Sequence, residues 1–360
     1  MSLAIPTTFV LSFGLLFAFR KVAKKINLVD KPNERKHHKG VIPLVGGVSI
    51  YCAIFLASVI FLEPDSDDWL YLACGTILIL IGVLDDKFDI SFKVRLFVQA
   101  GISLAMIFAA GLSLDHLGGI AGNVPVHLPA WVSYLVTVIA VIGAINAFNM
   151  VDGIDGLLGG LASVSFGALA ILFTLSGDHS LAENCLMYIA ALIPYILLNL
   201  GIPLGQRFKV FMGDAGSMLI GFTVVWLLIR ASQSEVTHAI RPVAALWIIA
   251  LPLMDMATIM TRRIRKGHSP FKPDRNHLHH ICQRIGLSSR MTLVVICVLA
   301  SLFAGIGIAG EIYGIHETIM FVLFLSLFAI YFATISYIFR ITSKVRFWLG
   351  KAPLPEETAA

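Results

Sequence analysis

The sequence predicts an all-α, polytopic integral membrane protein with about 11 transmembrane helices, and three observations lead to this fold class. The chain is 58% hydrophobic and 14% charged, with a mean hydropathy of +0.86. Soluble globular proteins carry roughly a quarter charged residues, so lipid is the expected solvent for most of this chain. The other two observations are a series of long apolar runs and a regular alternation of basic loops.

The apolar runs set the number of predicted spans. A helix that crosses a hydrocarbon core of roughly 30 Å needs about 20 apolar residues. Eleven runs reach or approach this length, and the eighth is the shortest. They cover residues 3–19, 44–62, 69–84, 94–112, 131–148, 157–176, 181–200, 216–230, 243–261, 291–309 and 318–339.

The basic residues set the orientation. Short loops that carry Lys and Arg resist translocation and stay in the cytoplasm. If the loop after the first run is cytoplasmic, the cytoplasmic segments hold 25 of the 27 Lys and Arg residues, all except Arg230 and Arg241. The sequence therefore predicts an odd number of spans, with the N-terminus in the periplasm and the C-terminus in the cytoplasm.

One domain is expected. Residues 1–340 form a single transmembrane domain in this prediction, and residues 341–360 form a flexible cytoplasmic tail. The first run has no charged leader and no cleavage site, which predicts a first span rather than a signal peptide. The net charge of +5 lies in the basic loops, so membrane lipids and not nucleic acid are the expected partners. The five cysteines include no CxxC pair, which argues against a zinc knuckle and a disulfide framework.

Acidic residues follow the third run in the segment VLDDKFD, which contains Asp85, Asp86 and Asp89. At the end of a helix these carboxylates would face the negative end of its dipole, which disfavours each by roughly 0.3–1 kcal/mol. Helix stability therefore does not explain them. Two interpretations stay open at this point, a solvated loop and a site for a cation or a general base.

A second acidic segment, NAFNMVDGIDG, ends the fifth run. Asn149, Asp152 and Asp155 are three residues apart, so they would lie along one face if the helix continued. Gly153 and Gly156 permit a tight backbone that a phosphate or a metal can approach. Because two carboxylate clusters share one predicted face of the membrane, a site is favoured over a solvated loop.

A third segment, VFMGDAGS, precedes the eighth run. Asp214 is a good N-cap for the following helix and needs no further reason to be there. Gly213 and Gly216 beside a helix N-terminus also form a backbone that suits a phosphate. Both interpretations stay open. Asn199, near the end of the seventh run, adds a neutral oxygen donor upstream.

The fourth segment is the long basic loop RRIRKGHSPFKPDRNHLHHICQRIGL. Leu278, Ile281 and Ile285 recur at helical spacing and predict a short amphipathic helix on the membrane surface. No Cys or Glu stands at ligand spacing and HExxH is absent, which argues against a zinc metalloprotease. A basic patch for lipid stays open, but donors to phosphate and sugar oxygens fit better. These donors are Arg275, Arg284, His277, His279 and His280.

The four segments together indicate phosphoryl transfer. Carboxylate oxygens without thiolates favour Mg²⁺ or Mn²⁺ over softer metals. Cationic loops beside such a site favour a polyphosphate substrate. Phosphoryl transfer needs mainly a metal that neutralises phosphate oxygens and positioned cationic side chains that take up charge.

In their order and spacing, VLDDKFD, NAFNMVDGIDG, VFMGDAGS and PDRNHLHH resemble the polyprenyl-phosphate N-acetylhexosamine-1-phosphate transferases, and the similarity covers nearly the whole chain. The resemblance implies an eleven-helix transferase that takes UDP-GlcNAc and undecaprenyl phosphate. It implies transfer of GlcNAc-1-phosphate to the lipid and release of UMP, with Mg²⁺ or Mn²⁺ as cofactor. It also implies a role at the start of lipid-linked surface polysaccharide synthesis, of the O-antigen or enterobacterial common antigen type.

The resemblance also implies roles for the acidic residues. Asp85 and Asp86 match the acidic pair of the family, one of which is the base, and Asp152 and Asp155 match its nucleotide-binding and catalytic motif. Asp214 matches the metal-binding aspartate. Asn199 stands where the family places a supporting metal ligand.

The remaining matches concern substrate binding. The PDRNHLHH loop is similar to the sugar-recognition segment of the GlcNAc branch, whereas the MurNAc-pentapeptide branch has three consecutive histidines. Lys93 and Arg95 lie where the family holds phosphates. The predicted substrate-binding residues are Lys93, Arg95, Asn149, Asp274, Arg275, His277, His279 and His280.

The predicted location is the bacterial inner membrane, with the active site facing the cytoplasm. Two rival functions stay open: a phospho-MurNAc-pentapeptide transferase of the same family, and a secondary transporter. A transporter needs charged residues along a path through the membrane, and only Asp255 lies well inside a run. The sequence leaves the oligomeric state open, a homo-oligomer included.

Overall fold

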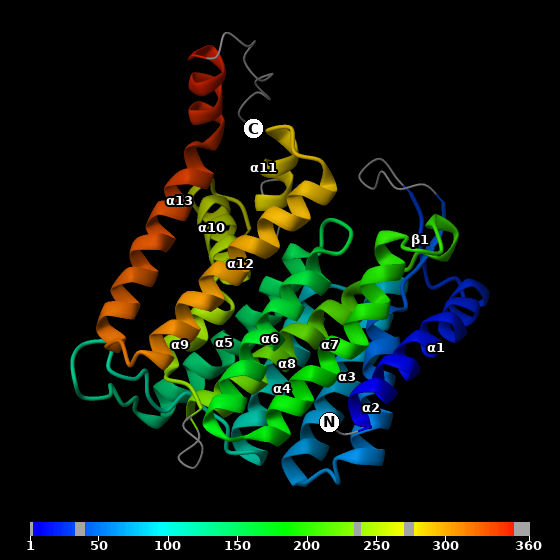
Figure 1. The fold of residues 1–360 in the computed structure, drawn as a ribbon, viewed down its shortest axis with the longest axis horizontal. Coiled ribbons are helices and arrows are strands. Elements are labelled where there is room, and N and C mark those ends of the chain that lie inside the picture. Colours follow the sequence, from blue (N-terminus) through cyan, green and yellow to red (C-terminus); the bar gives the residue numbers. More distant parts are fainter. Residues whose placement is uncertain (1–2, 33–39, 234–238, 270–276, 349–360) are drawn as a thin grey trace.

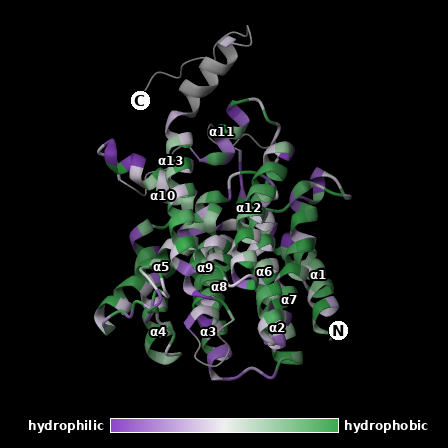
Figure 2. Ribbon diagram, turned by 60° about the vertical axis from the view of Figure 1, so that its left-hand side comes forward, coloured by the Kyte–Doolittle hydropathy of each residue, from purple (hydrophilic) through white to green (hydrophobic). Residues whose placement is uncertain are grey.

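The computed structural model describes residues 3–32, 40–233, 239–269 and 277–348, and these residues form a bundle of helices (Figure 1). Within them the only sheet is the two-stranded antiparallel pair β1 (Val29–Asp30) and β2 (Ile42–Pro43). The predicted all-α class is confirmed. Apolar residues cover the helices along their length, and hydrophilic residues gather toward their ends (Figure 2), as expected for a polytopic membrane protein.

Nine helices of the described chain are long and apolar enough to cross a membrane. The predicted eighth run, the shortest by sequence, is a full helix of 21 residues. The nine are α1 (Ala4–Lys25), α3 (Ser66–Phe88), α4 (Phe92–Ala109), α5 (Ala130–Val151), α6 (Leu157–Ser176), α7 (His179–Leu200), α8 (Gly213–Gln233), α12 (Ser289–Ile312) and α13 (Glu317–Trp348).

Two of the eleven predicted runs fold differently from a straight span. Run 44–62 gives α2 (Gly46–Phe61), which has only 16 residues. Run 243–261 gives α9 (Pro242–Ile248) and α10 (Ala250–Arg265), which are bent by 80° at their junction. The count of eleven spans therefore stays a prediction. Helix α13 continues past the predicted domain boundary at residue 340, as far as Trp348.

Helix α8 is the centre of the bundle. It packs against α2, α3, α5, α6 and α9. Of the residues in its apolar stretch, 94% are buried. Small residues allow this close packing. A Cβ added to Gly82 of α3 would lie 2.2 Å from the Cα of Ala215, and one added to Gly47 of α2 would lie 2.2 Å from the backbone of Gly216. The helix with the weakest sequence signal is thus the most enclosed.

A backbone junction fixes the start of α8. The amide of Phe211 donates to the carbonyl of Pro43 at 2.9 Å, and the amides of Gly46 and Gly47 donate to the carbonyls of Phe211 and Met212 at 2.9 and 3.0 Å. These bonds tie the segment before α8 to β2 and to the first turn of α2. The short 3₁₀ helix Gln206–Phe208 leads into this junction.

The opposite end of the bundle carries the two basic residues that the orientation rule leaves outside. Arg230 lies 3.5 Å from Asp68, and Arg241 lies 3.1 Å from Glu311. Each of these cations is therefore paired with a carboxylate. The loop between α4 and α5 is held here by the side chain of Gln233, which accepts from the amides of residues 115 and 116.

The close packing of α3 on α8 gives a first prediction. Gly82→Ala should lower the melting temperature of the purified protein in detergent, by an overpacking cost of about 1–3 kcal/mol. Gly167→Ala in α6 is the matched control, because no atom lies within 4 Å of the added Cβ. Alanine also favours a helix over glycine by roughly 0.5–1 kcal/mol. Equal melting temperatures for the two variants would contradict this account of the packing.

Candidate active site

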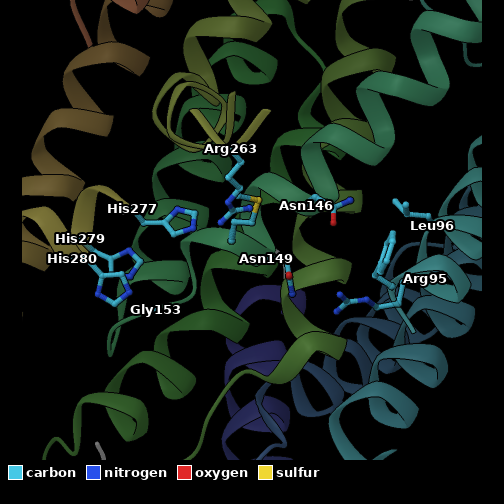
Figure 3. A pocket seen from close by; sticks show the side chains of 11 residues that line it. Arg95, Leu96, Asn146, Asn149, Gly153, Arg263, His277, His279 and His280 are labelled. Atoms are coloured by element: carbon cyan, nitrogen blue, oxygen red, sulfur yellow. The ribbon is translucent and has the colours of Figure 1, made fainter. Parts of the chain in front are cut away.

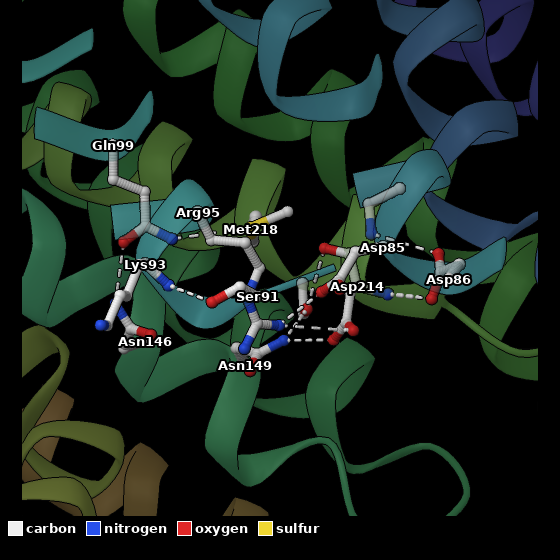
Figure 4. A network of polar contacts seen from close by, with 12 residues as sticks. Asp85, Asp86, Ser91, Lys93, Arg95, Gln99, Asn146, Asn149, Asp214 and Met218 are labelled. Carbon is white, nitrogen blue, oxygen red and sulfur yellow. Dashed lines mark hydrogen bonds and ion pairs between the residues drawn. The ribbon is translucent and has the colours of Figure 1, made fainter. Parts of the chain in front are cut away.

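Polar side chains from distant parts of the sequence meet at one end of the bundle. They come from the last turn of α3, the start of α4, the end of α5 and the start of α8, and Figure 4 shows how they lie. In an antiparallel bundle, alternate helix ends share one face, so these segments come together although they are up to about 130 residues apart. The predicted convergence of the acidic motifs is seen directly in these contacts.

Asp86 binds the N-terminus of α8. Its Oδ1 accepts the amide of Asp214 at 2.8 Å, and its Oδ2 accepts the amide of Ala215 at 3.4 Å. Gly213 has φ +76°, and a Cβ there would lie 2.4 Å from Oδ2 of Asp86. The interpretation of Asp214 as the helix cap was therefore wrong. A carboxylate from α3 caps α8, where the positive end of the helix dipole favours it.

Arg95 joins two carboxylates. Its Nη1 lies 2.6 Å from Oδ2 of Asp85 and 3.5 Å from Oδ2 of Asp214. The side chain of Asp85 is 4% exposed and that of Asp214 is 37% exposed. Asp85 is thus enclosed behind the guanidinium group, whereas Asp214 remains open to a ligand.

Asn149 is the amide beside Asp214. Its Nδ2 donates to Oδ1 of Asp214 at 2.6 Å and to the hydroxyl of Ser217 at 2.8 Å. Asn199, predicted as the supporting metal ligand, has both amide atoms bound to backbone. Its Oδ1 accepts the amide of Gly156 at 2.5 Å, and its Nδ2 donates to the carbonyl of Val210 at 2.8 Å. Asn199 therefore stabilises the turn before α6, and Asn149 takes its place as the candidate ligand.

Asp152 and Asp155 lie in a turn rather than on a helix face. Helix α5 ends at Val151 and α6 begins at Leu157, after Gly156 with φ +79°. The expectation that the helix continues through Asp155 was wrong, because the glycines stop it. Asp155 pairs with the buried Lys209 at 2.5 Å. Lys209, which no motif had indicated, thus neutralises one of the five clustered carboxylates.

Asp152 directly follows the last residue of α5 and is solvent-exposed. Its side chain is reached by solvent but is surrounded by protein, and desolvation followed by the charges of Asp214 and Asp155 raises its pKa to about 7. Negative charge is therefore in excess at this position. A cation bound nearby would lower the electrostatic cost of ionising Asp152.

A cavity of about 280 Å³ opens beside this cluster. Arg95 and Asn149 belong to both, so the cavity and the carboxylates form one continuous site (Figures 3 and 4). Helices α4, α5 and α10 and the histidine segment supply its walls. The lining residues are Phe92, Arg95, Leu96, Asn146, Asn149, Met150, Gly153, Arg263, His277, His279 and His280.

The three predicted histidines line this cavity from one side (Figure 3). They lie at the start of α11 (Leu278–Arg284), the short helix that the apolar spacing predicts. His279 is 2% exposed, and burial together with the neighbouring rings of His280 and His277 lowers its pKa to about 3. His279 is thus neutral at physiological pH. Its ring packs on Gly153, where an added Cβ would lie 2.1 Å from Nε2.

The remaining predicted residues divide into three groups. Lys93 is exposed and does not line the cavity. Asp274 and Arg275 lie outside the described residues. Asn146 and the buried Arg263 line the cavity but were missed. Asn146 precedes Asn149 by three residues in the same motif, which could have indicated it, whereas nothing distinguishes Arg263 from its basic neighbours in the sequence.

The donors at the site suit a hard divalent cation. Among the described residues, no group of three or more His, Cys, Asp and Glu side chains is arranged as a complete metal site. Mg²⁺ usually binds to one or two carboxylates, keeps water ligands and takes the rest from substrate phosphates. The partly exposed carboxylate of Asp214 and the amide of Asn149 fit this pattern, since the amide oxygen and nitrogen can exchange places by a flip.

The fold and the site define a polytopic membrane protein with an acidic, histidine-lined cavity at one end of its helices. The chain belongs to glycosyl transferase family 4, whose profile matches residues 69–232. It is 53% identical over 332 residues to the undecaprenyl-phosphate alpha-N-acetylglucosaminyl 1-phosphate transferase of Yersinia pestis, covering 92% of this chain and 90% of that protein.

Two further relatives carry the same name. The protein of Escherichia coli strain K12 is 50% identical over 334 residues, which cover 92% of this chain and 90% of that protein. The protein of Haemophilus influenzae is 47% identical over 344 residues, which cover 96% of each chain. The family establishes that the chain is a transferase enzyme.

The raised pKa of Asp152 gives a second prediction. The pKa of Asp152 is 3.8 in the unfolded chain and about 7 in the folded protein. The folded state therefore holds the extra proton between these values, so this contribution to stability is present below pH 3.8 and is lost as the pH rises to 7. In EDTA, Asp152→Asn should gain melting temperature relative to the wild type between about pH 5 and about pH 8.

The exposed Asp89, in the same acidic segment as Asp85, provides the control for this measurement. Asp89→Asn should follow the pH dependence of the wild type. If the melting temperature of Asp152→Asn also followed the wild type at every pH, the assigned environment of Asp152 would be incorrect.

Proposed function

We propose that the chain transfers GlcNAc-1-phosphate from UDP-GlcNAc to undecaprenyl phosphate, giving undecaprenyl-diphosphate-GlcNAc and UMP. One observation carries the proposal. The relatives whose name states this activity match about half of all positions over more than nine tenths of the chain. The cavity supports it, because cations, amides and histidines meet beside carboxylates there.

The cationic side chains of the cavity suit the diphosphate. Arg95 on α4 and Arg263 at the end of α10 come from different walls, so a diphosphate between them can be held from both sides. A lipid phosphate oxygen then attacks the β-phosphorus of the nucleotide sugar. The bond from this phosphorus to the bridging oxygen breaks, and UMP leaves with that oxygen. Held guanidinium groups stabilise the charge that develops on the phosphate oxygens.

The two adjacent aspartates receive different roles in this proposal. Both oxygens of Asp86 accept backbone amides of α8, so Asp86 holds the α8 N-terminus in place. Asp85 instead contacts side chains, namely the guanidinium group of Arg95 and the carboxylate of Asp214. We therefore assign the base that takes a proton from the lipid phosphate to Asp85 and not to Asp86.

The proposed cofactor is Mg²⁺, with Mn²⁺ as a substitute, held by Asp214 and Asn149. The ion would supply neutralisation of phosphate oxygens when bound. Arg95 lies within 3.5 Å of Asp214, so the same residue would contact both the ligand carboxylate and the phosphates.

The proposed location is the inner membrane of a bacterium, with the cavity facing the cytoplasm and the surrounding lipid. The described parts of the predicted cytoplasmic loops lie at the end of the bundle that carries the site (Figure 1), and UDP-sugars are cytoplasmic. The lipid product would start surface polysaccharides of the O-antigen or enterobacterial common antigen type.

The two rival functions fit less well. The motif places one residue between His277 and His279, unlike the three consecutive histidines of the MurNAc-pentapeptide branch. Asp255, the one acidic residue that favoured a transporter, is 2% exposed and bound on both oxygens. It does not line the cavity.

A third prediction tests the function. Asp214→Asn should reduce UMP release from UDP-GlcNAc and undecaprenyl phosphate by roughly two to three orders of magnitude, because a ligand carboxylate is lost. EDTA should abolish turnover of the wild type, and Mg²⁺ or Mn²⁺ should restore it.

A conservative change at the opposite end of the bundle is the matched control. Asp178 caps α7 through the amide of Leu181 at 3.0 Å, and asparagine caps helices equally well. Asp178→Asn should keep wild-type turnover. Comparable UMP release by both variants would refute the proposed site.

A fourth prediction concerns orientation. In a chain without its native cysteines, Lys87→Cys at the site end of α3 should react with a membrane-impermeant maleimide in inverted vesicles only. Glu63→Cys lies in the turn between α2 and α3 at the other end, so it should react in spheroplasts only. The reverse pattern would place the cavity on the wrong side for UDP-sugars.

A further inference from the structure

A buried carboxylate outside the cavity described above connects three elements around the histidine segment. Asp255 lies in α10, is 2% exposed, and accepts three hydrogen bonds. Its Oδ2 is 2.8 Å from Nδ1 of His277. Its Oδ1 accepts the amide of Leu278 at 3.0 Å and the hydroxyl of Tyr331 in α13 at 2.9 Å. Asp255 thus caps α11 from a neighbouring helix and joins it to α10 and α13.

The surroundings hold Asp255 firmly in place. Near it, Arg262 donates to the carbonyl of Ile335 at 3.5 Å, and Arg265 lies 5.0 Å from the ring centre of Phe332. These contacts bind α10 to α13 in the turns of α10 that follow the carboxylate. A buried carboxylate is costly unless its lone pairs are satisfied, and here each of its oxygens has a donor.

The bond to Asp255 determines which nitrogen of His277 carries the proton. A carboxylate acts only as an acceptor, so Nδ1 must be the protonated nitrogen. His277 lines the cavity with its ring 5.7 Å from that of His279 and nearly parallel to it. In the neutral ring Nε2 then carries the lone pair, and in the described part of the chain the ring's one hydrogen bond is that of Nδ1, so Nε2 can accept from a ligand.

We propose that Asp255 is a positioning residue that holds His277 in the Nδ1–H form, so that Nε2 accepts a hydrogen bond from a hydroxyl or amide N–H of the sugar. The phosphates need donors, which Arg95 and Arg263 supply from the same cavity. An acceptor instead suits the hydroxyl and N-acetyl groups of a hexosamine. This inference rests on the proposed function, because it assigns the histidine side of the cavity to the sugar of the nucleotide.

Asp255→Asn is the decisive variant, because it changes which nitrogen of His277 carries the ring proton and keeps the shape of the side chain at position 255. The asparagine oxygen can still accept from Leu278 and Tyr331. Its NH₂ group would face Nδ1 of His277 and donate to it, which moves the ring proton to Nε2. If Asp255 had a purely structural role, activity would tolerate this change. The proposed role instead predicts that Nε2 of His277 no longer accepts a hydrogen bond from the sugar.

The experiment uses the purified full-length protein with UDP-GlcNAc, undecaprenyl phosphate and Mg²⁺. Asp255→Asn should lower kcat/KM for UDP-GlcNAc about 10- to 100-fold, as large as the loss when a metal-bound histidine loses its carboxylate partner. The KM for undecaprenyl phosphate should stay unchanged, and the melting temperature should remain near that of the wild type. In a His277→Ala background, Asp255→Asn should add little further loss.

Two controls separate positioning from folding. Glu311→Gln removes a carboxylate from an ion pair at the other end of the bundle and should leave kcat/KM unchanged. Asp255→Ala removes all three hydrogen bonds and should lower the melting temperature as well as activity. The inference is overturned if Asp255→Asn keeps wild-type kcat/KM, or if its loss is equally large in the His277→Ala background.

A spectrum of protein labelled with ¹⁵N-histidine provides a readout that needs no turnover. The ring-nitrogen signals of His277 are identified by their absence from the spectrum of His277→Ala. They should show a protonated Nδ1 in the wild type and a protonated Nε2 in Asp255→Asn. Unchanged nitrogen signals would overturn the inference. If the wild type formed no lipid-linked GlcNAc while these signals exchanged, the proposed function would fail and the assigned role of Asp255 in the tautomer would stand.

Discussion

The carboxylate of Asp86 at the N-terminus of α8 is the interaction on which the site depends. The first amides of a helix lack partners within the helix, and α8 is buried among its neighbours from Ala215 onward. Asp86 satisfies two of them from the last turn of α3. Asp85 directly precedes Asp86, and the amide of Asp214 donates to Asp86. The bond therefore places the side chains of Asp85 and Asp214 around the guanidinium group of Arg95. Without the bond, the end of α3 and the start of α8 would have no fixed relation.

The charges around this bond are balanced incompletely. Arg95 offsets Asp85 and part of Asp214, and Lys209 offsets Asp155. Desolvation and the charges of Asp214 and Asp155 raise the pKa of Asp152, and in the described part of the chain no ion pair with a cation offsets them. A protein optimised for stability alone would replace such a residue. Excess negative charge beside Arg95 is instead what a site needs if it is to attract a divalent cation together with a diphosphate.

The sequence predicted the features that depend on local pattern. The lengths of the apolar runs predicted the helices. The Lys and Arg distribution predicted which loops share one face of the membrane, and the motifs predicted the acidic residues that meet at one end of the bundle. It failed where a distant residue decides the outcome. For the segment around Asp214 the sequence left a helix cap and a phosphate site open, but the cap comes from Asp86 on another helix. Asn199 was chosen as a ligand and proved to bind backbone, and Asp255 was considered only as evidence about transport. No spacing rule reveals contacts between residues more than 20 positions apart.

The two sides of the cavity have different origins in the chain. The family profile matches residues 69–232, which include the acidic pair, Arg95, Asn149 and Asp214, so the phosphate side belongs to the part that defines the family. The histidines lie beyond it, on a short helix held by Asp255 and α13. A short helix of this length is not stable alone and takes its position from what caps and covers it. Under the proposed function, sugar recognition can therefore change through the histidine segment and its supports, while the phosphate chemistry between α3 and α8 stays the same.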